Sequence, residues 1–156
     1  MKKIIFNIKY FFQWLFGKVY KKETTKVIYP EFPVNKLSDK LYTLIESLII
    51  NQQKHLTIHP FLCQVAYSHS QWMALNKIKG HHHFEDRKNQ ILLQTPFKEI
   101  SELVGYNFRS AEGYLHAFLN SPKHKKILDK DWDYIGIAVD WDDEGKEYLT
   151  IILTND

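Results

Sequence analysis

Two runs of β-forming residues near the end of the chain place the tightest constraint on its fold. Residues 134–141 and 147–154 are rich in Ile, Val, Leu, Tyr and Trp, and Asp142-Asp143-Glu144-Gly145-Lys146 separates them. Acidic residues with a glycine between two such runs are typical of an antiparallel hairpin. Because the preceding residues show helical periodicity, we expect an α+β fold in which helices flank a small antiparallel sheet.

Several stretches ahead of the hairpin carry helical signals. Residues 36–54 repeat apolar side chains at helical spacing after Ser38, a suitable N-cap. A second helix is expected from Pro60 to Ile78, ending before Gly80. On its apolar side lies His69, which we interpret as a hydrogen-bonded core or rim histidine. Further helices are expected over 110–120 and from Pro122 to about 128, and residues 87–94 are helical or irregular.

The first 20 residues form an apolar or amphipathic segment that is distinct from the rest. On a helix, one face would carry Ile4, Ile8, Phe11, Phe12 and Leu15. This layout favours contact with a membrane surface, although packing on the domain or use as an export signal are open alternatives. Residues 21–35 contain two prolines and are predicted to be a linker, which leaves residues 36–156 as the domain.

Composition excludes several classes of function. The net charge is only +3 and the lysines are dispersed, so no nucleic-acid surface is predicted. The single cysteine, Cys63, lies in an apolar helical run, which favours a buried and inert thiol. The sequence contains no glycine-rich phosphate loop and no serine or cysteine in a recognised nucleophile motif.

Three sequence motifs between Gly80 and Leu128 contain the candidate functional residues. The first is His81-His82-His83-Phe84-Glu85-Asp86-Arg87, the second is Ser101-Glu102-Leu103-Val104-Gly105, and the third is Phe118-Leu119-Asn120-Ser121-Pro122-Lys123-His124 with Ile127-Leu128. Together with Gly136-Ile137-Ala138-Val139 they resemble, in order and spacing, the motifs of bacterial members of the CAP superfamily, also called the SCP domain. This superfamily comprises the cysteine-rich secretory proteins, antigen 5 and the plant pathogenesis-related proteins.

The resemblance implies an α-β-α sandwich with a cleft lined by two histidines and two acids, which can hold a divalent metal such as zinc. By motif position, His81 would be the first histidine, Glu102 the first acid and His124 the second histidine, so that His81 and His124 are the candidate metal ligands. Arg87 would line the cleft and pair with a carboxylate or a loop carbonyl. The second acid has no counterpart, because Ser121 stands at its position. Leu103 and Phe118 also replace the usual Asn and Trp.

Two imidazoles and a carboxylate suit zinc binding, general acid–base catalysis or a structural hydrogen-bond network. We predict a non-enzymatic module that binds a small molecule, lipid or peptide in its cleft. It would be membrane-associated or extracytoplasmic, although a cytoplasmic location is left open. The alternatives are a metal-dependent hydrolase using His81, Glu102 and His124, and a structural domain with a vestigial cleft.

Overall fold

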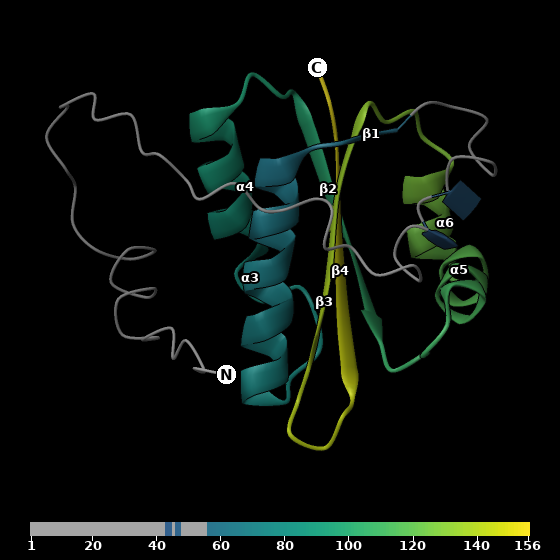
Figure 1. Cartoon of the computed structure of the whole chain (residues 1–156). Coiled ribbons are helices and arrows are strands. Elements are labelled where there is room, and N and C mark those ends of the chain that lie inside the picture. The colour runs from purple at the N-terminus through teal and green to yellow at the C-terminus, as the bar shows by residue number, and fades with distance from the viewer. Residues whose placement is uncertain (1–42, 45, 48–55) are drawn as a thin grey trace, which may run out of the picture.

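The computed structural model describes residues 43, 44, 46, 47 and 56–156 (Figure 1). Residues 43, 44, 46 and 47 are helical and Leu44 is buried, as the predicted apolar stripe requires. The expected N-terminal segment 1–20, the linker 21–35 and most of the helix over 36–54 lie outside the described residues. None of the helices in the described part of the chain is both long enough and apolar enough to span a bilayer.

Four complete helices are described. They are α3 (Pro60–Asn76), α4 (Phe84–Gln94), α5 (Ala111–Leu119) and α6 (Pro122–Leu128). Proline opens α3 and α6, where its missing N–H costs no intrahelical hydrogen bond. Ser110 caps α5 by accepting a hydrogen bond of 3.0 Å from the backbone N–H of Gly113. The ends of these helices agree with the sequence predictions to within two residues, except that α4 begins three residues earlier.

The sheet has the strand order β1-β3-β4-β2. Strands β3 (Tyr134–Trp141) and β4 (Glu147–Asn155) form the predicted hairpin, and β2 (Glu99–Tyr106) pairs antiparallel with β4 from the other side. The two-residue strand β1 (Thr57–Ile58) pairs parallel with β3. The predicted antiparallel sheet is therefore confirmed for three strands, with a short parallel strand added at one edge.

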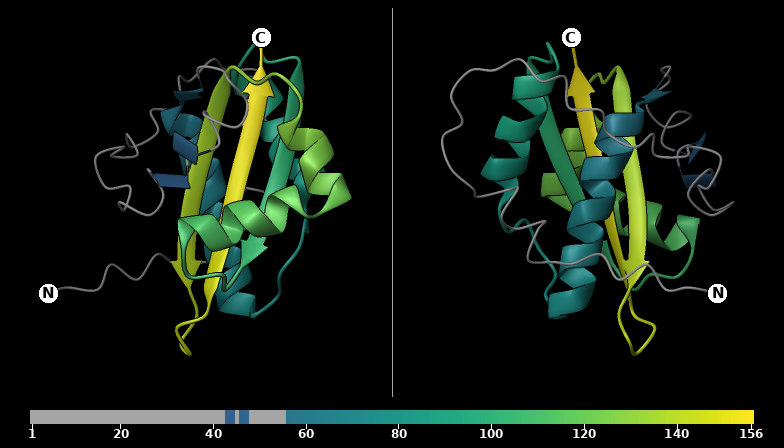
Figure 2. Two further views of the ribbon diagram at one scale, coloured as in Figure 1. Left: turned by 90° about the vertical axis from the view of Figure 1, so that its right-hand side faces the viewer. Right: turned by 60° about the vertical axis from the view of Figure 1, so that its left-hand side comes forward.

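Helices cover both faces of the sheet, so the predicted α-β-α sandwich is confirmed. Helices α3 and α4 lie on one face and α5 and α6 on the other (Figures 1 and 2). Every residue of β4 from Glu147 to Thr154 is buried, which is expected of a central strand covered on both sides. Gly136 of β3 permits the closest approach, because an added Cβ would lie 2.2 Å from the backbone carbon of Leu62 in α3.

Candidate functional site

A buried carboxylate, Glu102, lies at the centre of the candidate site. It projects from β2 toward the α3–α4 face, and its side chain is only 1% exposed. Arg87 of α4 meets it with a two-pronged contact: Nε donates to Oε2 and Nη2 donates to Oε1, each at 2.8 Å. Such planar pairing is the geometry that guanidinium and carboxylate groups favour when they are withdrawn from water. Arg87 also donates through Nη1 to the carbonyl of His82 at 2.7 Å, so its predicted pairing is confirmed.

His81 contributes the third side chain of the site. Its Nδ1 lies 3.0 Å from Glu102 Oε1, and because a carboxylate paired with arginine is ionised, Nδ1–H is the donor. The side chain of His81 is 49% exposed, in contrast to Arg87 at 8%. The predicted pair of His81 and Glu102 is thus in direct contact, with the carboxylate buried and the imidazole at the surface.

His69 of α3 is the fourth member of this group. Its Nε2–H donates to the carbonyl of Gly80 at 2.9 Å and lies 3.8 Å from Glu102 Oε1. Burial lowers the pKa of His69 to about 4, so the ring is neutral at pH 7. By fixing the peptide group immediately before His81, it helps to orient that residue. We refer to His69, His81, Arg87 and Glu102 as the Glu102 cluster.

Electrostatics keep Glu102 ionised in spite of its burial. Desolvation alone would raise its pKa, but the hydrogen bond from His81 and the charge of Arg87 outweigh desolvation and leave the pKa below the usual value of 4.5. The cluster therefore holds a stable ion pair at neutral pH. A carboxylate in this state is a poor proton donor, and both of its oxygens are already engaged.

His124 occupies a different environment. It belongs to α6 on the opposite face of the sheet, where its ring meets Phe118 edge-to-face at 5.2 Å. Burial, followed by the charge of His81, lowers the pKa of His124. Among the described residues, Glu102 bonds to His81 and Arg87 and not to His124. The structure thus joins three of the four predicted cleft residues directly, His81, Arg87 and Glu102.

A family model described as the cysteine-rich secretory protein family, CAP, matches residues 51–153, which is more than half of the chain. The chain belongs to the CAP family. A search of curated proteins by sequence found no significant match.

Solved structures share this CAP fold. An outer surface protein from Borrelia burgdorferi is 20% identical with a TM-score of 0.66, and the alignment covers 75% of this chain and 92% of that one. A cysteine-rich secretory protein from Staphylococcus aureus is 22% identical with a TM-score of 0.61, and the alignment covers 80% of this chain and 41% of that one. An extracellular SCP-domain protein from Bacillus anthracis is 19% identical with a TM-score of 0.60, and the alignment covers 74% of this chain and 40% of that one. This chain therefore spans about two fifths of the latter two proteins.

Zinc, the metal implied by the CAP resemblance, does not fit the Glu102 cluster in this arrangement. Both Glu102 oxygens are engaged by Arg87, and Ser121 offers no carboxylate in place of the second acid. Within the described residues, no group of three or more His, Cys, Asp or Glu side chains is arranged to hold a metal ion. The contacts of the Glu102 cluster do not test the predicted metal site at His81 and His124, which stays a prediction.

The other two departures from the CAP motifs are core substitutions. Leu103 is fully buried and packs on the α5–α6 side of the sheet, and Phe118 is 1% exposed in the same core. An apolar residue suits both positions. The sequence predicts His69 as a core or rim histidine and does not connect it to the site. Its position on the buried side of α3, the helix that leads into the histidine loop, is the signal that could have done so.

Proposed function

We propose that this protein is a non-enzymatic CAP-domain module that binds a lipid surface. The observation that supports a non-enzymatic role is the two-pronged contact between Arg87 and Glu102. Glu102 accepts two hydrogen bonds from Arg87 and one from His81, which leaves about one of its four lone-pair sites for a base or metal-ligand role, and its side chain is only 1% exposed. In this proposal the Glu102 cluster shapes a loop and performs no chemistry.

The loop that it shapes is Gly80–His83, which we call the histidine loop. Its carbonyls at Gly80 and His82 are bound by His69 and Arg87. The rings of His82 and His83 each lie 5.5 Å from the ring of Trp72, a residue of α3. All three histidines of the loop are exposed. A fixed loop with outward-facing imidazoles provides a contact surface that needs no ordering on binding.

Apolar side chains adjoin this loop at the end of α3. Leu75 is 59% exposed and Ile78 is 44% exposed. Exposed aliphatic residues next to a polar rim suit a membrane interface. The amphipathic segment predicted over residues 1–20 would add a second contact. Related structures come from an outer surface protein and an extracellular protein, which supports an extracytoplasmic location for this chain.

A vesicle co-sedimentation assay with the full chain tests this proposal. We expect binding to vesicles of phosphatidylcholine and phosphatidylglycerol. The affinity should fall about tenfold or more in Leu75→Ser/Ile78→Ser, because the variant lacks two exposed aliphatic groups that contact with lipid would bury. Leu93→Ser is the matched control, since Leu93 is 86% exposed on α4 away from the loop. A chain lacking residues 1–20 reports the contribution of that segment. Wild-type protein that stays in the supernatant would rule out the lipid-surface role.

The metal-dependent hydrolase remains the alternative, because the exposed side of His81 faces solvent while Glu102 orients its other nitrogen. Ester and peptide hydrolysis by the wild type, Glu102→Gln and His81→Ala separates the two functions. We expect no hydrolysis above background in any of the three, with or without added zinc. Turnover in the wild type that disappears in His81→Ala would establish the enzyme instead.

A further inference from the structure

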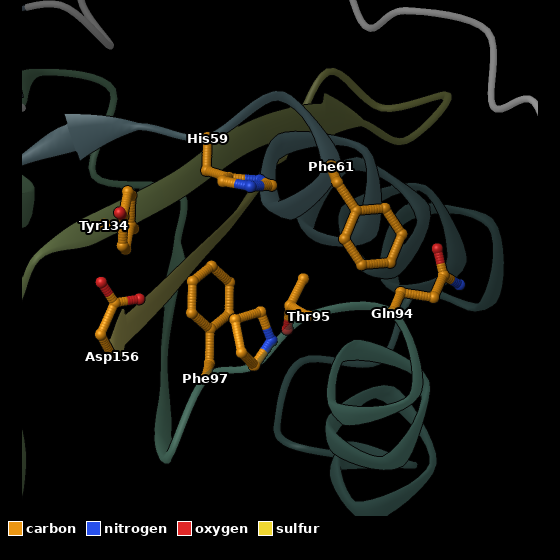
Figure 3. A pocket seen from close by; sticks show the side chains of 8 residues that line it. His59, Phe61, Gln94, Thr95, Phe97, Tyr134 and Asp156 are labelled. Carbon is orange, nitrogen blue, oxygen red and sulfur yellow. The ribbon is translucent and has the colours of Figure 1, made fainter.

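A pocket of about 490 Å³ lies at the other end of the α3–α4 layer from the Glu102 cluster (Figure 3). It opens where α3 begins and α4 ends, beside the first residue of β3. Its lining residues are His59, Phe61, Gln94, Thr95, Pro96, Phe97, Tyr134 and Asp156. The volume is within the range of small-molecule sites, roughly 300–1,000 Å³. No residue of the Glu102 cluster contributes to it, so it is independent of the function proposed above.

Four of the eight lining residues have aromatic rings, and mutual contacts hold three of these rings in place. The ring of His59 meets Phe97 at 5.5 Å and Tyr134 at 5.8 Å, both edge-to-face, and Phe97 and Tyr134 lie 5.1 Å apart. Phe61 stands across the opening from Tyr134 (Figure 3). Phe97 is 6% exposed and anchors the group in the core beneath α3 and α4. The pocket is therefore preformed, and a ligand would not have to pay for ordering these rings.

The charge of the lining is negative. Burial lowers the pKa of His59, so its ring is neutral at pH 7. Asp156 is then the single charged residue among those that line the pocket, and no described residue pairs with its side-chain carboxylate. The backbone N–H of Asp156 donates to Asp133 Oδ2 at 3.2 Å, which adds a second carboxylate close to the rim. An anionic ligand is disfavoured here.

Few hydrogen-bonding groups are free to recognise a polar neutral ligand. The hydroxyl of Thr95 donates to the Ile91 carbonyl at 2.8 Å and is already used. What remains is the Nδ1 atom of His59, which has no hydrogen-bond partner among the described residues, the π surface of the rings, whose negative potential attracts cations, and the Asp156 carboxylate. We infer that this pocket binds a small organic ammonium, with its cationic head against the aromatic rings and Asp156. A free quaternary amine and the choline head of a phospholipid share this chemistry.

A titration of the full chain followed by amide chemical shifts tests the inference. Choline and its uncharged isostere 3,3-dimethylbutan-1-ol differ only in the cationic nitrogen. We expect choline to bind about tenfold more tightly and to shift the amide signals of His59, Phe61, Gln94, Thr95, Phe97 and Tyr134. Binding of soluble dihexanoylphosphatidylcholine would identify a phospholipid head as the source of the ammonium group. Binding of choline without binding of this phospholipid would identify a free amine as the ligand.

Three substitutions of lining residues test the inference further. Tyr134→Leu and Phe61→Leu keep apolar bulk but remove a ring, and each should weaken choline binding about three- to tenfold. Asp156→Asn should weaken it about two- to fivefold. Tyr67→Leu on α3 and Glu112→Gln on α5 are controls outside the pocket and should bind as the wild type. Equal affinity for the uncharged isostere, unchanged affinity in the pocket variants, or shifts confined to the histidine loop would overturn the inference.

Discussion

At the scale of single residues, two buried glutamates show two ways to stabilise a carboxylate inside a sheet. Glu102 faces α3 and α4 and is paired with the charged Arg87. Glu147, on the opposite face of the sheet, accepts from neutral donors, Tyr114 Oη at 2.7 Å and Trp141 Nε1 at 3.2 Å. Both satisfy the requirement that a buried polar group be hydrogen-bonded. The charged pair also ties a surface loop to the core, because Arg87 binds the histidine loop as well.

The stability of the protein should depend on pH through His69. Its folded pKa of about 4 lies below the ordinary 6.5, so the unfolded chain takes up the proton first as the pH falls. The stabilisation is complete above pH 6.5 and is lost progressively toward pH 4. Between pH 7 and pH 5 we expect a loss of about 2 kcal/mol from this residue. Urea unfolding at the two pH values measures it.

His69→Gln removes the titrating group, so its loss of stability between pH 7 and pH 5 should be smaller by the same amount. His116→Gln, at an exposed position of α5, is the control and should behave as the wild type. An identical pH dependence in the wild type and His69→Gln would show that the ring is not held neutral in the fold. Further loss below pH 4.5 is expected as Glu102, whose pKa is lowered, is finally protonated.

The candidate site could be predicted only in part, because its members come from separate elements. His81, Arg87 and Glu102 stand in recognisable phrases, but their contacts span 15 and 21 positions of sequence. Spacing of this size carries no information on which side chains converge. His124 illustrates the limit: its phrase is the most specific of the three, yet it lies on the opposite side of the sheet from the carboxylate. Strand pairing decides this, and no local pattern encodes it.

At the scale of elements, the hairpin and the helices were predictable and the remaining strands were not. Strand β2 reads Glu99 to Tyr106, and on its α3–α4 side the charged Glu102 interrupts the apolar alternation that identifies a strand. Strand β1 has only two residues, too few for any periodic signal. Helix α4 begins after His83 in a left-handed conformation, φ 60°, in place of a usual capping residue. Tertiary contacts thus override local preference at these three elements.

The packing of α3 on β3 gives a prediction at this scale. Gly136→Ala places a methyl group where the backbone of Leu62 lies 2.2 Å away, and backbone has little freedom to move. We expect a loss of about 3 kcal/mol in the free energy of unfolding, measured by urea denaturation.

Gly145→Ala is the matched control, since its added Cβ meets nothing within 4 Å and only its φ of 72° is strained. It should cost about 1 kcal/mol. Equal losses in the two variants would show that α3 can move away from the sheet without penalty.

At the scale of the whole molecule, one sheet joins two apolar layers. One core lies between the sheet and α5–α6 and includes Trp132, and the other lies between the sheet and α3–α4. Strand β4 supplies side chains to both, with Ile151 in the first and Ile152 in the second. Because neither layer can lose the sheet without exposing the other, we expect a single cooperative unfolding transition.

Two single-tryptophan variants check this cooperativity by fluorescence. One retains only Trp132, which is buried beside α6, and the other retains only Trp72, beside the histidine loop. In each variant, the urea transition followed by tryptophan fluorescence should coincide with the transition followed by circular dichroism. A transition for Trp72 that precedes the loss of secondary structure would show that the α3 layer opens independently.

The strand order has a consequence for biosynthesis. β4 lies between β3 and β2 in the sheet, although it is the last of the four strands to leave the ribosome. Until it emerges, β2 has no partner strand, and α3 and α5 have only fragments of a sheet to cover. A chain arrested before residue 147 would therefore present its apolar faces to chaperones, and the ion pair of Arg87 and Glu102 would lack the strand that positions it.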